Sequence, residues 1–141
     1  MTAVLWLTTA FVAAPALKDR EKPAPSLVGE WVIESSVVGG RPSKANRNRW
    51  VFRADGTRAI FDTTKELARG TYATDPKANP ATLDLDPGPA DGVYPCIYRL
   101  DGDTLTLNVG WQKSERPAAF ESPAGSMCTL YVMNRKKEDR P

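Results

Sequence analysis

The chain has 141 residues, which is enough for a single domain with one modest hydrophobic core. Its 19 basic and 17 acidic side chains leave a net charge of +2, too small to predict attraction to nucleic acid or to an anionic membrane. The chain contains no histidine, which removes the commonest general base, the commonest zinc ligand and every nucleophile activated by histidine. We therefore expect a protein that is not an enzyme, with no catalytic residues, no metal site, no cofactor and no nucleic-acid partner.

Residues 1–17 have the pattern of a secretory signal peptide. They carry no charged side chain, and their apolar run ends in Ala14-Pro15-Ala16, a small-residue pattern that signal peptidase cleaves. No lysine or arginine precedes the run, so an uncleaved anchor and a buried helix are competing interpretations, although a membrane span needs about 20 apolar residues. Residues 18–26 are charged and contain two prolines, which is typical of a linker. These features predict an extracytoplasmic protein, periplasmic or secreted, with no membrane contact beyond the signal segment.

From Leu27 onward, apolar and polar residues alternate with a period of two, as in strands with one face on a core and one in solvent. Asp55-Gly56 and Asp101-Gly102-Asp103 separate such runs and are strong hairpin signals. Gly39-Gly40, with Arg41-Pro42 after it, is expected to end the first strand. Eight strands are predicted in this way: 29–38, 47–54, 57–63, 68–74, 81–86, 95–100, 104–109 and 128–135.

Eight consecutive short strands with tight turns predict an all-β fold, an eight-stranded antiparallel up-and-down barrel, with a related sandwich as the alternative. Closure of the barrel would pair the first strand with the last and remove exposed edges. The barrel domain is expected to span residues 27–136, followed by a charged tail at 137–141. Only residues 43–46 and 64–67 leave room for a helical turn.

The first strand contains Gly29-Glu30-Trp31, and the last strand ends at Arg135. This pair resembles the lipocalin signature, in which G-x-W opens strand one and a C-terminal arginine lies over the tryptophan ring. A guanidinium on an indole face forms a cation–π contact worth about 0.5–2 kcal/mol. The resemblance implies structural roles for Gly29, Trp31 and Arg135.

More of the chain matches a narrower pattern, in order: Leu27–Trp31, Gly70–Tyr72, Pro80 with Leu83–Leu85, Ile97–Leu105, Arg116–Phe120 and Leu130–Arg135. Together these segments are similar to the uncharacterised lipocalin-like domain family that is expanded in planctomycete bacteria. The resemblance covers about residues 27–135 and implies a small, often exported barrel with no established activity. Two positions depart from the family pattern, since Cys96 stands where Gly is usual and Asn108 where Cys is frequent. These departures put shared thiol chemistry in doubt.

Cys96 and Cys128 are the only cysteines of the chain. In an exported protein an even number of cysteines favours a disulfide. However, both are expected at the starts of strands that run in the same direction, with strand 104–109 between them. Two strand spacings amount to about 9.6 Å, whereas a disulfide joins Cα atoms less than about 7 Å apart. A disulfide and a pair of small buried apolar side chains both remain open.

The longest stretch without strand pattern is 110–127, and a loop of this length in a small domain is either functional or disordered. Its aromatic and basic residues predict that it packs, with a lid over one barrel mouth as one interpretation. In the alternative, Phe120 fills the core and Arg116 pairs with a carboxylate. We predict that a small apolar molecule is bound by Trp31, Trp50, Tyr72, Tyr98, Arg116 and Phe120.

Two functions therefore remain open. The leading hypothesis is a non-enzymatic extracytoplasmic domain that binds a small, largely apolar molecule at one barrel mouth. In the second, an eight-stranded barrel filled by its own side chains is a protein-interaction or envelope structural module. Its expected sign is an exposed apolar patch around Trp111 and the 110–127 loop, with no cavity. The aspartates of 84–86 and 101–103 are interpreted as turn and surface positions, and calcium ligands or a hydrolase pair are the weaker alternatives.

Overall fold

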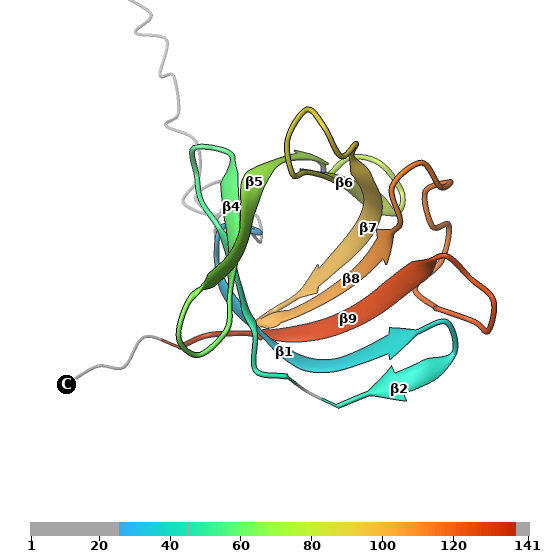
Figure 1. Ribbon diagram of the computed structural model, residues 1–141, viewed down its shortest axis with the longest axis horizontal. Coiled ribbons are helices and arrows are strands. Elements are labelled where there is room, and N and C mark those ends of the chain that lie inside the picture. The colour runs from blue at the N-terminus through green and yellow to red at the C-terminus, as the bar shows by residue number, and fades with distance from the viewer. Residues whose placement is uncertain (1–25, 45, 138–141) are drawn as a thin grey trace, which may run out of the picture.

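The computed structural model describes residues 26–44 and 46–137. The predicted signal peptide, nearly all of the linker and most of the charged tail lie outside these residues. The described chain forms nine strands and no helix, so none of it could cross a membrane as a helix (Figure 1). The strands are β1 (Gly29–Val38), β2 (Arg41–Ser43), β3 (Arg49–Phe52), β4 (Thr57–Phe61), β5 (Glu66–Asp75), β6 (Ala81–Asp86), β7 (Tyr94–Asp101), β8 (Thr104–Gly110) and β9 (Cys128–Arg135).

The sheet closes into an antiparallel barrel of eight strands. From β3 to β9 each strand pairs with the next one along the chain, and β1 pairs with both β3 and β9. The register of the closing pair runs from Trp31 opposite Arg135 to Val38 opposite Thr129, with one bulge between Ile33 and Ser35. The predicted all-β, eight-stranded up-and-down barrel of the lipocalin-like type is therefore confirmed.

A ninth strand, β2, lies outside the barrel and was not expected from the sequence. Gly39 and Gly40 adopt positive φ angles of 54° and 82°, so they form a hairpin turn instead of ending the pairing. The first half of β1 pairs with β3, and Ser36–Val38 pair with β2. Pro42 is compatible with this position because β2 is an edge strand and needs no second hydrogen-bonded neighbour.

The inner face of the barrel is packed with apolar side chains. Alternation along each strand brings one side chain in two to the inside, and burial of each large one contributes about 1.5–3 kcal/mol. The largest fully buried members of this core are Trp31, Phe52, Leu83, Leu105, Leu107 and Met133.

Residues 111–127 run along the outside of the barrel, which corrects the expectation of a lid over its mouth. Asn108 faces outward from β8, opposite Ile97 of β7, and is fully buried. Its Nδ2 donates to the carbonyl oxygens of Ala119 and Glu121, each at 2.8 Å. The buried amide thus attaches the segment to the outer face of the sheet.

Candidate ligand-binding site

A cleft of about 540 Å³ opens beside the β5–β6 turn. Strand β6 begins at Ala81, opposite Tyr98, whereas β7 continues to Asp101 in register with β8 alone. The end of β7 therefore has no β6 neighbour at this point. The β5–β6 turn and Phe120 border the space that is left beside it. The cleft is lined mainly by apolar side chains, from Pro76, Asn79, Pro80, Ala81, Tyr98, Arg99, Leu100 and Phe120.

Phe120 is held at the cleft by contacts on both sides of it. The carbonyls of its neighbours Ala119 and Glu121 accept the two hydrogen bonds from Asn108. The guanidinium carbon of Arg99 lies 4.6 Å from the centroid of the Phe120 ring, a cation–π distance. Phe120 therefore does not fill the core, as one interpretation of the sequence had it, but lies half-buried on the outer surface.

Tyr98 forms the inner edge of the cleft. It belongs to the barrel core and is nearly buried. Burial raises the pKa of its phenol, with a smaller opposing influence from a hydrogen bond to Thr74. The cleft thus combines a neutral phenol, an aromatic ring and, at its rim, the charged side chain of Arg99.

The other predicted lining residues lie elsewhere. Trp50 and Tyr72 belong to an aromatic cluster inside the barrel, where Trp50 lies 5.4 Å from Tyr131 and Tyr72 lies 5.0 Å from Phe52, measured between ring centroids. Of the six predicted residues, the cleft brings together Tyr98 and Phe120.

Arg116 acts as an anchor for the outer segment. Its Nη2 lies 2.7 Å from Oδ1 of Asp84, and its Nη1 donates to the backbone carbonyls of Cys96 (2.8 Å) and Leu83 (3.3 Å). The alternative in which Arg116 pairs with a carboxylate is therefore the one observed. Asp84 of β6 therefore serves as the surface ion-pair partner of Arg116.

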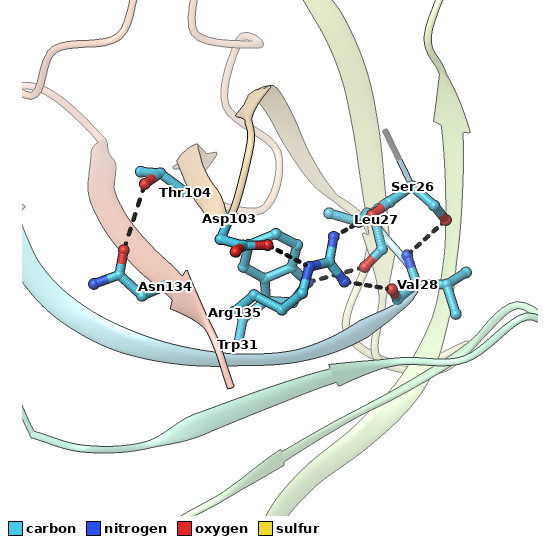
Figure 2. Close-up of polar contacts among 8 residues, drawn as sticks. All are labelled: Ser26, Leu27, Val28, Trp31, Asp103, Thr104, Asn134 and Arg135. Carbon is cyan, nitrogen blue, oxygen red and sulfur yellow. Dashed lines mark hydrogen bonds and ion pairs between the residues drawn. The ribbon is translucent and has the colours of Figure 1, made fainter. Parts of the chain in front are cut away.

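Trp31 is fully buried at one end of the barrel and is covered by Arg135 (Figure 2). The guanidinium carbon lies 4.3 Å from the centroid of the indole, and its nitrogens donate to the carbonyls of Ser26 and Val28, each at 2.9 Å. The indole Nε1 in turn donates to the carbonyl of Leu27 at 2.9 Å. These contacts close the barrel end and leave the indole unavailable to a ligand.

Both cysteines are free thiols. Strand β8 separates them, as expected, and the register places them on opposite faces of the sheet. Cys96 pairs with Val109 and belongs to the core, whereas Cys128 pairs with Gly110, one residue later. A side chain that points inward cannot be bonded to one that points outward, so the structure has no disulfide between them.

Two more aspartates of the expected turns, Asp86 and Asp103, have polar partners. Oδ1 of Asp86 accepts from the backbone N–H of Gly88 at 2.9 Å, and Oδ1 of Asp103 lies 3.5 Å from Nε of Arg135. Within residues 26–44 and 46–137, no group of three acidic, cysteine or histidine side chains is placed to hold a metal ion.

One charged residue inside the barrel, Arg58, was not predicted from the sequence. Arg58 lies on β4 opposite Phe52 of β3 and Gly70 of β5. Because Phe52 faces the core, Arg58 also faces inward, and only 5% of its surface is exposed. The signal was available, since the hairpin at Asp55-Gly56 fixes the register that puts Arg58 on the inner face.

A group of exposed apolar side chains lies where the two ends of the 111–127 segment meet. Trp111 is 47% exposed and Met127 54% exposed, and the N–H of Trp111 donates to the carbonyl of Met127 at 3.0 Å. Gln112 reaches the carbonyl of Gly92, next to the exposed Val93. This is the patch that the second functional hypothesis expected.

No family model and no curated protein matches the chain. The fold is established by the strand pairings alone, and a fold of this kind hosts many unrelated functions. Function must therefore be argued from the cleft and from the other polar groups described above.

Proposed function

We propose that this domain binds a small, largely apolar molecule in the cleft beside the β5–β6 turn, without a catalytic step. The observation that carries the proposal is the cleft itself, about 540 Å³ in volume and lined mainly by apolar groups. This volume lies in the range of ligand pockets, which are apolar with a few polar groups that fix orientation. The phenol of Tyr98 and the guanidinium of Arg99 would supply those polar contacts.

The proposal is supported by how the lining is held. Phe120 lies on a segment remote in sequence from β7, yet the amide of Asn108 fixes the backbone on either side of it. A preformed aromatic wall loses little conformational entropy when a ligand binds. The site is therefore expected to bind without a large rearrangement.

The test is a fluorescence titration with N-phenyl-1-naphthylamine, a neutral apolar probe, on residues 18–141. We expect saturable binding that Phe120→Ala weakens at least tenfold. Phe61→Ala is the matched control, because Phe61 also lies under an arginine, with the Cζ of Arg49 5.4 Å from its ring, but outside the cleft. Phe61→Ala should change the dissociation constant by less than about twofold.

Native mass spectrometry after exposure to a total lipid extract would then give the mass of a retained ligand. The absence of saturable binding to the wild type, or equal binding by wild type and Phe120→Ala, would reject the proposal. In that case the exposed Trp111 and Met127 would favour the second function, a filled barrel that contacts an envelope protein. Cross-linking at Trp111 by a photoreactive analogue would identify such a partner.

We further propose that the chain is an exported member of the lipocalin-like group that it resembles. The closed barrel and the arrangement of Gly29, Trp31 and Arg135 support this proposal. The mass of the mature protein tests the export: cleavage near Ala16 in an extracytoplasmic fraction is expected, and full-length protein retained inside the cell would contradict it.

A further inference from the structure

The barrel contains a buried positive charge. Arg58 projects from β4 into the interior, beside Phe52 and Gly70. Its pKa is lowered from the usual arginine value, chiefly because burial disfavours the charged form, and the Cys96 thiol, Tyr94 and Asp86 are close enough to oppose that effect. An arginine side chain nonetheless stays protonated in proteins, so the interior carries a full charge.

The guanidinium has no anionic partner in the described part of the chain. Its Nε is buried and makes no hydrogen bond there, and no carboxylate of residues 26–44 and 46–137 forms an ion pair with it. Asp86, the carboxylate that influences it, has its Oδ1 bonded to the N–H of Gly88. Cys96 stays a neutral thiol, because burial raises its pKa to about 12.

A buried, unpaired charge is expensive, and mutational data show that an uncompensated buried ion is strongly destabilising. A methionine would fill similar space without that penalty. A ligand that supplied the opposite charge would remove this penalty.

We propose that Arg58 is an anion-binding residue inside the barrel that takes the carboxylate of a small molecule. The planar guanidinium matches a carboxylate through two parallel hydrogen bonds. One positive charge, already influenced by the carboxylate of Asp86, fits a monoanion better than a phosphate dianion. This site is separate from the cleft, whose lining does not include Arg58, and the inference stands even if the cleft binds nothing.

The surroundings of Arg58 suit an anion that carries an apolar chain. Ile60, Tyr94 and Tyr131 lie on the inner face of the barrel and are only half-buried, so solvent reaches this part of the interior. Trp50 packs against Tyr131 in the same region. Apolar and aromatic surface is thus available next to the charge, as an amphipathic ligand requires.

The test compares sodium decanoate with decanol, which has the same chain without the charge, by isothermal titration of residues 18–141. We expect the wild type to bind decanoate at least tenfold more tightly than decanol. In Arg58→Met that ratio should fall to about one, and in Arg69→Met it should stay unchanged, because the Arg69 side chain is 82% exposed. Sodium acetate tests whether the site takes a free small anion or the carboxylate head of an amphipathic molecule. Binding of acetate as tight as that of decanoate indicates a free small anion, and no binding of acetate indicates an amphipathic molecule.

Thermal unfolding provides an independent measurement. Without ligand, Arg58→Met should melt at the same temperature as the wild type or higher. Decanoate should raise the melting temperature only in proteins that keep Arg58. Arg58→Lys, which keeps the charge and loses the two-pronged geometry, should bind more weakly but still prefer decanoate. A decanoate-to-decanol ratio that is the same in wild type and Arg58→Met, or no carboxylate binding by the wild type, would overturn the inference.

Discussion

Arg135 stacks on the indole of Trp31, with its guanidinium carbon 4.3 Å from the ring centroid. The same guanidinium donates hydrogen bonds to the carbonyls of Ser26 and Val28. One side chain at the end of β9 therefore ties the closing strand pair to the segment that precedes β1. Removal of this side chain is expected to loosen the closed end of the barrel.

Arg135→Ala should lower the free energy of unfolding by about 2–4 kcal/mol, because it removes a cation–π contact and two charge-assisted hydrogen bonds. Urea denaturation followed by tryptophan fluorescence measures the change. Arg69→Ala is the matched control, since the exposed Arg69 pairs with Glu66 on the surface, an interaction worth about 0–1 kcal/mol. Equal effects of the two substitutions would show that the stacking contributes no measurable stability.

Gly29→Ala should destabilise the protein by about 1–3 kcal/mol. Gly29 has a φ of 141°, and a Cβ at this position would lie 2.5 Å from Nη1 of Arg135. The double variant Gly29→Ala/Arg135→Ala should lose less stability than the two single variants lose together, because without the Arg135 side chain the steric conflict is gone. Gly102 has a φ of 57°, and a Cβ added there would meet open space. Gly102→Ala therefore isolates the cost of the backbone conformation alone. Strict additivity in the double variant would refute the steric explanation.

The strands and the closed end of the barrel could be predicted from the sequence because their signals are local. Alternation and hairpin residues set β1, β6 and β9 to the residue, and Gly29 and Trp31 lie two positions apart on one strand. The hairpin that forms β2 was missed because Gly-Gly followed by proline is equally typical of a strand that ends.

The cleft could not be predicted in the same way because it depends on distant pairings. The position of Phe120 is set by Asn108 and Arg99, which lie on two different strands, and no periodicity relates the three residues. The opposite orientation of the two cysteines likewise depends on register across β8. By contrast, Arg58 follows from the alternation itself and was missed because a charged residue is rarely assigned to a core.

Asn108→Asp should lower the free energy of unfolding by about 2–4 kcal/mol. The substitution keeps the shape of the side chain but replaces the buried donor with a carboxylate oxygen facing two carbonyls. Because those carbonyls flank Phe120, cleavage by chymotrypsin within residues 111–127 should become faster, and binding of the apolar probe at the cleft should weaken.

Asn134→Asp provides the comparison for this substitution. Asn134 is exposed and its Nδ2 donates to a carboxylate oxygen of Glu34 at 2.9 Å. Water can hydrate both carboxylates there, so the cost should stay below about 1 kcal/mol. If proteolysis within 111–127 accelerates equally in both variants, Asn108 is not what fixes the outer segment.

The thiol of Cys96 should be protected from alkylation by its surroundings. Burial raises its pKa to about 12, against a usual value near 9, and the Arg116 guanidinium offsets only part of that effect. At pH 8 the thiolate fraction is then about a thousandfold below that of an exposed cysteine. In Cys128→Ala, iodoacetamide should label Cys96 at least a hundredfold more slowly in buffer than in 6 M urea, as followed by intact mass.

The same shift gives a direction for stability against pH. The folded state holds the Cys96 proton more tightly than the unfolded state does. The contribution of this thiol to the free energy of unfolding is therefore complete below pH 9 and declines as the pH rises from 9 toward 12. Cys96→Ser in the Cys128→Ala background should remove that part of the alkaline loss. In unreduced wild type, urea should expose two thiols that each take one label, because both cysteines are free. Incorporation of no label would instead mean that the cysteines are bonded, which their positions on opposite faces of the sheet forbid in the folded barrel.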